Sequence, residues 1–507
     1  MILCEITACV DTSGTLQKFY VSDGRFVTKA TDTPAHQSFD ESIIDPGSLG
    51  ITAFSDGRTG GSTKLETGEL ILANIDGQYD NWINYSFDGR PITIYSGTSG
   101  ANYPAGFVKV FTGTMESIDA LWDKIIIRMR DKQFVFSTPL LATKYAGNNT
   151  APNGVEGAVG DIKDTLKPRI YGRVFNAPCT PVNTSKLIYQ ISDIALNSID
   201  AVYDKGAALT AGADFATNAL LQAATPATST FITCKAEGMF RLGSTQAGTI
   251  TADATQGATA ANRTVAQIVK LIAQAAGVSA GDVSSVDVAA LDALNSSEVG
   301  IYIGDDASTQ DCVDRLLGSV GGYCSFDSLG VLRMGRLSIP TGTPVVEIDE
   351  YEILEGVERS SPRDISIPVF RVNVNYAKNY TVQGTDVAGS VTAERRAYID
   401  KEWRTQKSED ATIKTQWLLA TEYTVDSLIT NVASANTEAA RQLSIYKTPK
   451  SIYELSISLE LFADHNLKIM DVVTLNVPRF GLVGKPLRII GYRLEIISSK
   501  VVVQCWG

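Results

Sequence analysis

Short strand-like runs separated by turn residues constrain this 507-residue chain more than any other feature. Near its start, apolar residues occupy every second position from Ile2 to Val10, and near its end a cleaner alternation runs from Tyr453 to Leu461. A period of two is the pattern of a strand that buries one face. Turn pairs such as Asp76-Gly77 and Asp88-Gly89 separate the early runs. Many short strands with frequent turns predict a barrel or a sandwich.

The chain is too long for one ordinary hydrophobic core, so several domains are expected. We divide it into an N-terminal β-barrel (1–145), a linker with a small β subdomain (146–260), an α/β module (261–343) and a C-terminal β-barrel with one helix (344–507). The α/β module contains a hairpin predicted over 323–337,. The predicted fold class is therefore mainly β (α+β), with a β-barrel at each end and the two smaller parts between them.

Helical periodicity interrupts the strands at three places. Apolar residues recur at helical spacing over 264–276, 309–317 and 434–447, which predicts three helices. Gly277 stands where the first helix needs a C-terminal glycine, and Ser308 precedes the second helix as an N-cap. The sequence thus gives these helices definite ends as well as apolar faces.

A faint similarity links the two ends of the chain. Residues 89–94 (GRPITI) resemble residues 484–489 (GKPLRI), and Phe111-Thr112-Gly113 resembles Ile489-Ile490-Gly491. The spacings differ between the two ends. Two related barrels and two unrelated sets of hairpins with similar turns therefore both remain open.

The charge balance argues against a protein that grips nucleic acid. With 44 Lys and Arg against 56 Asp and Glu the net charge is −12, whereas phosphate-binding proteins need basic faces. An acidic wall would still let DNA slide past without sticking. The densest acidic run, Glu347 to Glu358, is either a solvated face or a wall of a DNA channel.

Targeting signals and metal motifs are lacking in the sequence. No apolar run approaches the ~20 residues of a membrane helix, and Met1 to Val10 has no basic start or long apolar stretch of a signal peptide,. We therefore expect a protein made in the cytosol and not exported. The seven cysteines are scattered without a Cys-x-x-Cys pair, which predicts no disulfide framework, no zinc site and no cofactor.

Catalysis has few candidate residues. The only histidines, His36 and His465, lie in polar, turn-like runs and are expected to be surface residues. Residues 277–281 match the Gly-x-Ser-x-Gly letters, but that motif needs a strand before the serine and a helix after it. Here the predicted helix comes first, so Ser279 is expected in a loop. We assign no catalytic residue and predict that the protein is not an enzyme.

One loop has the alternating oxygen side chains of a calcium site, from Asp76 to Asn81. Asn81 stands where that loop needs glycine, and Phe87 where it needs a bidentate glutamate. The loop therefore predicts a plain turn stabilised by its own side chains, and we assign no metal ligands.

Several stretches together resemble the tail-tip hub proteins of long-tailed bacteriophages. The resemblance covers most of the chain but rests on many loose motifs, and none is specific by itself. The stretches are Gly68–Gly77, Phe87–Pro91, Val110–Gly113, Tyr145–Gly147, Lys167–Gly172, Ala201–Gly206 and Met470–Leu475.

The resemblance implies assembly rather than catalysis. Hubs of this kind are similar to homotrimeric rings in which each subunit contributes two tail-tube-like barrels. The six barrels then match the sixfold tail tube above the ring, and the three subunits match a threefold fibre below it. The implied partners are the subunit itself, a distal tail protein or tail tube, a central fibre or tip protein, the tape-measure protein, and DNA in transit only. The implied location is the tail tip of the virion, after assembly in the cytoplasm of the bacterial host. A distal-tail ring protein, a receptor-binding tail adhesin and a tail-associated hydrolase are the alternatives.

Overall fold

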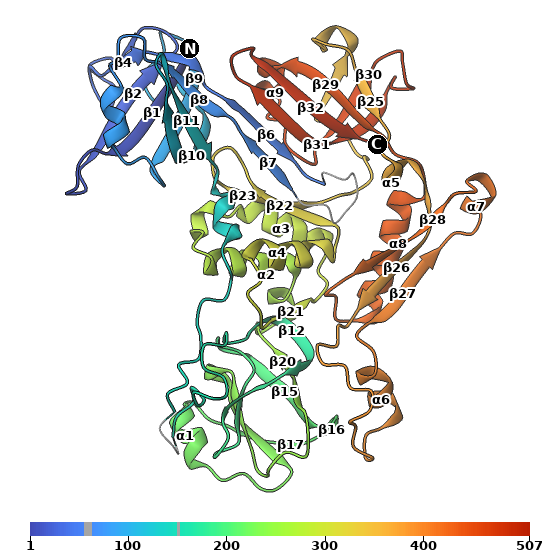
Figure 1. The fold of residues 1–507 in the computed structure, drawn as a ribbon. Helices are drawn as coiled ribbons and strands as arrows, with labels where there is room; N and C mark the ends of the chain where they lie inside the picture. Colours follow the sequence, from blue (N-terminus) through green and yellow to red (C-terminus); the bar gives the residue numbers. More distant parts are fainter. Residues whose placement is uncertain (55–62, 150–152) are drawn as a thin grey trace.

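The computed structural model describes residues 1–54, 63–149 and 153–507. In that part of the chain the strands form six sheets, and helices are fewer. The prediction of a mainly β protein is confirmed, but none of the described sheets closes into a barrel. The reason is that a bent segment of chain, rather than a ladder of hydrogen bonds, links the two ends of each large sheet,. The two large sheets lie side by side at the top of Figure 1.

The N-terminal sheet has nine strands in the order β3-β4-β2-β1-β9-β10-β11-β8-β5. All neighbours are antiparallel except β2 and β4, which are parallel. Its elements are β1 (Ile2–Cys9), β2 (Leu16–Ser22), β3 (Phe26–Val27), β4 (Ser38–Glu41), β5 (Ile43–Asp45), β8 (Glu69–Ala73), the 3-10 helix η1 (Asp80–Asn84), β9 (Pro91–Gly97), β10 (Phe107–Ala120) and β11 (Lys124–Arg130).

Both faces of β1 are buried, whereas its alternating sequence predicted one buried face and one face in solvent. Cys4 and Ile6 point into the main core, and Leu3 on the opposite face packs into a separate cluster with Phe26 and Tyr103. The aromatic residues of the β3–β4 region cover the face that the alternating pattern left to solvent. Their position along the chain gives no local sign of this, because it depends on how the later strands fold back.

The C-terminal sheet has the order β24-β30-β31-β32-β29-β25. Its elements are β24 (Val346–Asp349), η6 (Glu350–Glu352), β25 (Glu358–Ser360), β29 (Ile452–Ser458), α9 (Leu459–Asp464), β30 (Val472–Asn476), β31 (Lys485–Glu495) and β32 (Lys500–Trp506). The strand predicted from Tyr453 to Leu461 is wrong at its end, because Ser458 caps α9 by accepting the Leu461 N–H at 3.1 Å. The capped N-terminus of α9 therefore makes residues 459–461 helical, where the alternating pattern predicted strand,.

A hairpin from the N-terminal sheet crosses into the C-terminal sheet (Figure 1). Its strands are β6 (Ser48–Thr52) and β7 (Lys64–Thr67), and β6 pairs antiparallel with β31 from Ser48↔Glu495 to Thr52↔Gly491. The two large sheets also share one hydrophobic cluster, which includes Ile6 and Ile457. Each such buried side chain contributes about 1.5–3 kcal/mol, so shared burial and shared strand pairing both fix the two sheets relative to each other.

Two five-stranded sheets form the lower part of the molecule in Figure 1, in the orders β16-β15-β20-β12-β21 and β13-β14-β19-β18-β17. A short 3-10 segment, η2 (Lys132–Ser137), leads from the N-terminal sheet toward them. Their elements are β12 (Arg169–Pro178), β13 (Thr180–Asn183), β14 (Ile188–Gln190), β15 (Ser198–Asp204), β16 (Ala207–Ala208), β17 (Thr210–Asp214), α1 (Asn218–Ala223), β18 (Thr230–Cys234), η3 (Lys235–Glu237), β19 (Met239–Leu242), β20 (Ile250–Thr255) and β21 (Gly300–Ile303).

An α/β module lies at the centre of Figure 1. The two helices predicted here and the hairpin are confirmed, and Ser308 caps its helix through a reciprocal pair of hydrogen bonds with Asp311. The helix α3 was not predicted, since only Val288 and Leu291 of its residues are buried. The elements are η4 (Ala260–Asn262), α2 (Val265–Ala275), η5 (Ala280–Asp282), α3 (Ser285–Leu294), α4 (Thr309–Gly318), β22 (Gly322–Phe326) and β23 (Leu332–Arg336).

A further segment, inserted between β25 and β29, forms a three-stranded sheet in the order β27-β26-β28. Its long helix α8 confirms the third predicted helix and packs on β26. The elements are α5 (Arg363–Ser366), β26 (Val369–Tyr376), α6 (Ala393–Ile399), β27 (Arg404–Glu409), α7 (Ile413–Gln416), β28 (Thr421–Asp426) and α8 (Val432–Tyr446). No helix in the described part of the chain is long and apolar enough to cross a membrane.

Candidate functional site

The two large sheets repeat one plan. Six strands of each sheet correspond in chain order: β4, β5, β8, β9, β10 and β11 in the first sheet, and β24, β25, β29, β30, β31 and β32 in the second. In space, the order β9-β10-β11-β8-β5 of the first sheet matches the order β30-β31-β32-β29-β25 of the second. The short helices η1 and α9 follow the third strand in each. The strands β1 and β2 are extra in the N-terminal copy, standing between β9 and β4. We call these two copies the N-terminal and C-terminal units.

The similarity noted between the chain ends agrees with this plan only in part. Phe111-Thr112-Gly113 lies on β10 and Ile489-Ile490-Gly491 on β31, which are equivalent strands. Each strand carries a register shift near these residues, between Lys109 and Phe111 and between Ile489 and Gly491. The other pair, 89–94 and 484–489, falls on β9 and β31, which are not equivalent.

One bent segment reaches both ends of the sheet in each unit. In the N-terminal unit Ser42, between β4 and β5, donates its N–H to the Ser22 carbonyl at 2.9 Å and accepts the Ala73 N–H at 2.7 Å. In the C-terminal unit β24 pairs with β30 at one end, and Leu354, between β24 and β25, donates its N–H to the Ser456 carbonyl of β29 at 2.8 Å toward the other end. Both units therefore curve far enough for one short stretch of chain to touch opposite ends of the sheet.

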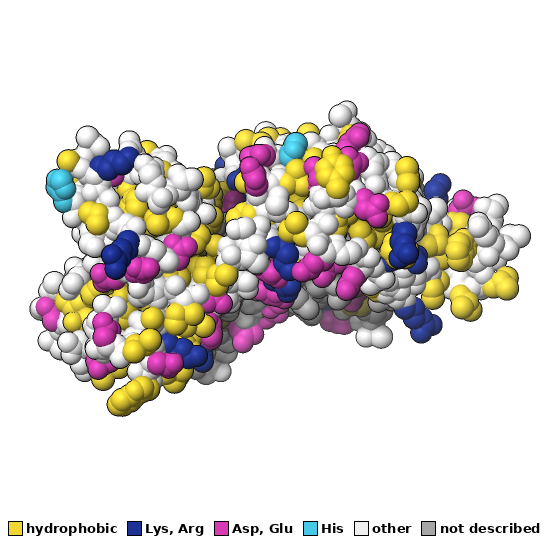
Figure 2. Space-filling view, turned by 90° about the horizontal axis from the view of Figure 1, so that it is seen from above, with side chains coloured by type: hydrophobic (Ala, Val, Ile, Leu, Met, Phe, Trp, Pro, Cys, Tyr) yellow, Lys and Arg dark blue, Asp and Glu magenta, His cyan; other side chains and the backbone are white. Residues whose placement is uncertain are grey.

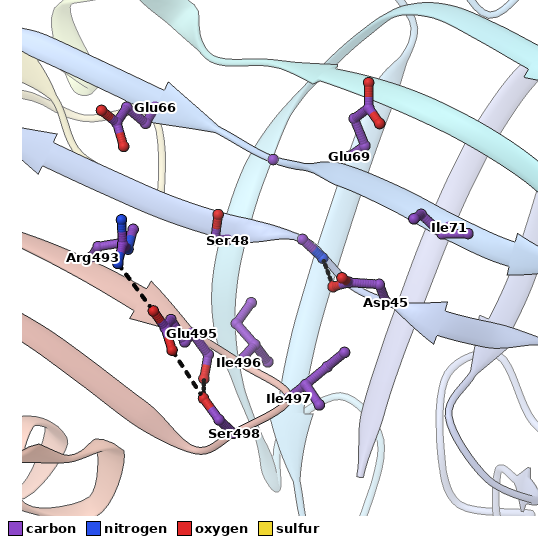
Figure 3. Close-up of a pocket in the computed structure, with 12 residues that line it drawn as sticks. Asp45, Ser48, Glu66, Glu69, Ile71, Arg493, Glu495, Ile496, Ile497 and Ser498 are labelled. Atoms are coloured by element: carbon purple, nitrogen blue, oxygen red, sulfur yellow. Dashed lines mark hydrogen bonds and ion pairs between the residues drawn. The ribbon is translucent and has the colours of Figure 1, made fainter. Parts of the chain in front are cut away.

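An open cavity of about 500 Å³ lies at the junction of the two units (Figure 3). Asp45, Glu66 and Glu69 line it from the N-terminal unit, and Arg493 and Glu495 from the β31–β32 hairpin. Hydrogen bonding from Lys500 lowers the pKa of Glu495, which also forms an ion pair with Arg493 at 3.2 Å. Among the described residues no group of three or more His, Cys, Asp and Glu side chains could hold a metal ion.

Two glycines allow the hairpin to leave the N-terminal unit at this cavity. Gly68 donates its N–H to the Ser48 carbonyl at 2.7 Å, and a Cβ added to Gly68 would lie 2.5 Å from the Ser48 nitrogen. Gly47 has a φ of +84°, a left-handed conformation that side chains disfavour,. The close approach of β6 and β7 at this point therefore requires glycine, which has no side chain, at both positions.

A larger and mostly apolar cavity of about 610 Å³ lies where the units meet the α/β module. Phe462 and Met334 line it, and Val108 and Leu294 at its border are 69% and 59% exposed. Burial lowers the pKa of Arg488, which donates to the Ser338 carbonyl at 2.9 Å. Arg488 thus links β31 to the chain after β23. The cavity lies between the N-terminal unit, the C-terminal unit and the α/β module.

The residues considered for catalysis lie apart from one another. His36 and His465 are both exposed, as predicted, and Ser279 is exposed with its hydroxyl donating to Asp282 at 2.8 Å. Gly277 follows α2 with a φ of +101°, which confirms its predicted role at the helix end. The structure brings no histidine to Ser279.

The loop considered for calcium is a turn held by its own side chains. Asn74 accepts the Tyr79 N–H at 2.9 Å and donates to Asp80 at 2.9 Å. All seven cysteines are free. In the acidic run Glu347 and Glu358 are exposed, and Glu355 forms an ion pair with Lys500 at 3.1 Å.

Exposed apolar side chains form two groups that sequence periodicity did not reveal. Leu418 and Leu419, after α7, are 87% and 75% exposed, and Figure 2 shows hydrophobic side chains at the tip of the arm that carries α7. Ile75 and Trp122 are 85% and 97% exposed at the end of the N-terminal unit. The signal in the sequence was their place within turns, where large apolar residues are uncommon. Such groups mark surfaces for partners.

Solved structures that resemble this chain include tail proteins, one of them from a prophage, and the virion of a gene transfer agent particle. The chain matches a 43 kDa tail protein of prophage MuSo2 from Shewanella oneidensis with 11% identity and a TM-score of 0.41, covering 99% of this chain and 95% of that one. It matches the tail protein from Neisseria meningitidis MC58 with 10% identity and a TM-score of 0.43, covering 99% and 96%. It matches the virion of a native gene transfer agent particle with 14% identity and a TM-score of 0.43, covering 68% and 85%.

The resemblance to phage tail proteins that the sequence indicates thus has a counterpart among solved structures. No family model matches the chain. No curated protein matches it by sequence.

Proposed function

We propose that this chain is a non-enzymatic structural subunit of a phage tail tip, the baseplate hub that joins the tail tube to the tip fibre. The observation that carries the proposal is the strand order shared by the N-terminal and C-terminal units. Three copies of a chain with two equivalent units offer six units around one axis. Such a ring fits a sixfold tube on one side and a threefold fibre on the other.

Each unit is proposed to act as a barrel of the tail-tube kind. The bends at Ser42 and Leu354 support this, because each lets one segment bond to opposite ends of its sheet. Closing a sheet removes the free edges that would otherwise pair with unrelated chains. The four segments 1–145, 146–260, 261–343 and 344–507 are the proposed divisions, the last with the β26–β28 insert as a separate part.

The proposed ring surrounds a channel for DNA in transit and for the tape-measure protein. The net charge of −12 and the exposed carboxylates between Glu347 and Glu358 support a wall that repels phosphate,. The distal tail protein or tail tube and a central fibre or tip protein are the proposed neighbours in the virion, after assembly in the host cytoplasm.

A cryo-EM reconstruction of the assembled tail tip, without imposed symmetry, tests the proposal. We expect a threefold ring with two units of each subunit around an open channel. A sixfold ring would assign the chain to the distal-tail ring proteins, and a position away from the axis would assign it to the adhesins. Release of fragments from purified host cell wall by the full chain would overturn the non-enzymatic assignment.

A further inference from the structure

One strand edge is filled in the C-terminal unit and open in the N-terminal unit. The last five residues of β31, Gly491–Glu495, pair with β6. The equivalent residues of β10 are Glu116–Ala120, the last five before its hairpin turn. On that side of β10, pairing with β9 ends at Thr114, and no described strand continues it.

The backbone of this β10 edge is available for hydrogen bonds. Leu121 donates its N–H to the Lys124 carbonyl at 2.8 Å. Since antiparallel strands direct alternate residues toward the partner, Ile118 and Ala120 direct their N–H and C=O groups away from β11. Ala120 is exposed and Ile118 is half-buried. A row of such unpaired groups is a template for another strand.

Apolar side chains lie beside the same edge. Trp122 is 97% exposed and Leu121 is 47% exposed in the turn that follows β10. Asn74 donates its N–H to the Asp123 carbonyl at 2.8 Å, which brings Ile75, 85% exposed, next to this turn. A strand added here would gain both main-chain hydrogen bonds and apolar burial.

We propose that the edge Glu116–Ala120 takes a strand from a second copy of this chain, namely β27. This inference rests on the proposed ring and adds the contact that joins neighbouring copies in it. Within one chain, β6 of the insert between β5 and β8 fills the edge of β31. The insert at the same place in the C-terminal unit, between β25 and β29, ends in two free edges, β27 and β28. The pairing between copies thus continues the one already present within the chain.

Charge selects β27 over β28. The edge of β10 carries the exposed carboxylates Glu116 and Asp119. On β27 the exposed Glu409 lies beside Lys407, which is 61% exposed, whereas β28 exposes the two carboxylates Glu422 and Asp426 and carries no cation. Opposite charges on facing strands stabilise the pair, and like charges destabilise it. Because the two pairing surfaces differ, the contact runs head to tail, and a threefold rotation between copies would close it as the proposed ring.

Hydrogen exchange of the full chain at low and at high concentration tests the proposal. In the assembled form we expect slowed exchange at 116–121 and at 404–409. The segment 491–495 is the internal control, because β6 protects it at both concentrations. A ring in which 116–121 exchanges as fast as in the monomer overturns the strand addition and leaves the proposed hub intact. A chain that stays monomeric at every concentration overturns both.

Two sets of variants complete the test. Ala120→Pro removes an outward N–H at an exposed position and is expected to give a monomer with the unfolding midpoint of the wild type. Ala211→Pro is the matched control on β17, another free edge, where Thr210 N–H points inward to the Ser229 carbonyl, and it is expected to assemble normally. Lys407→Glu should weaken association about tenfold, and adding Glu116→Lys should restore it. Equal association of the single and the double charge variants would overturn the pairing of β27 with β10.

Discussion

The guanidinium of Arg336 on β23 lies 2.6 Å from the carboxylate of Glu438 on α8, and the two side chains are only 7% and 1% exposed. Arg441 binds the same carboxylate at 2.6 Å and donates to the carbonyls of Leu337 and Val320. Burial and the neighbouring Arg441 lower the pKa of Arg336 to about 10, so it stays charged at neutral pH. One carboxylate therefore pairs with two arginines between the α/β module and the insert.

Removing that carboxylate is expected to destabilise the protein strongly. Glu438→Ala leaves the buried Arg336 and the half-buried Arg441 without a counter-ion, which costs about 3–5 kcal/mol in the free energy of unfolding,. Denaturant unfolding measures the loss. The control is Glu422→Ala, whose pair with Arg371 is exposed by 44% and 30% and should cost less than about 1 kcal/mol. Equal costs for the two variants would contradict the importance of burial.

The junction hairpin is expected to depend on the small size of Gly68. Gly68→Ala places a Cβ against the Ser48 backbone, which costs about 1–3 kcal/mol by overpacking,. Hydrogen exchange should then quicken at 48–52, where β6 pairs with β31. Gly100→Ala is the control, because a Cβ there meets nothing within 4 Å. Unchanged exchange in the Gly68 variant would argue that the strands can separate without loss.

The stability of the lower sheets is expected to fall with rising pH through Asp253. Burial raises the pKa of this carboxyl, although it accepts hydrogen bonds from the Asn176 N–H at 2.7 Å and the Tyr203 hydroxyl at 2.8 Å. A carboxyl whose pKa is higher in the folded state holds its proton there more tightly. Its contribution is therefore most favourable below the unfolded pKa of about 3.9 and declines as pH rises above it.

The variant Asp253→Asn isolates this effect. The melting temperature of the variant minus that of the wild type should increase from about pH 4 toward neutral pH. The sign follows because asparagine keeps an oxygen for the Asn176 N–H and carries no buried charge. A difference that stays constant across this range would show that Asp253 titrates alike in the folded and unfolded chain.

The exposed loop after α7 is expected to contribute to contacts between molecules and not to the folding stability of the chain. Leu418→Ser with Leu419→Ser should change the free energy of unfolding by no more than about 0.5 kcal/mol, because both side chains are in solvent,. Leu428→Ala, at a position that is 5% exposed, should cost about 2–5 kcal/mol. Light scattering at high concentration should show weaker self-association for the double variant alone. A large loss of stability in that variant would mean that the loop packs within its own chain.

The sequence by itself determined the elements whose cause is local. The helices α2, α4 and α8 follow from apolar spacing over neighbouring turns, and the cap at Ser308 follows from one hydroxyl three residues before an acceptor. The hairpin β22–β23 follows from a single turn. The exposed positions of His36 and His465 follow in the same way from their polar surroundings. These features need no partner distant in the chain, so a short window contains their physical cause.

Only the tertiary structure decided which strands meet. The pairing of Thr52 with Gly491 joins segments from opposite ends of the chain, and the plan shared by the two units appears only in strand order. Backbone N–H and C=O groups are alike in every residue except proline, so a strand edge carries almost no information about its partner in its own sequence. The same reason hid the burial of Leu3 on the second face of β1 and the open edge of β10, because both depend on what the rest of the chain places beside them.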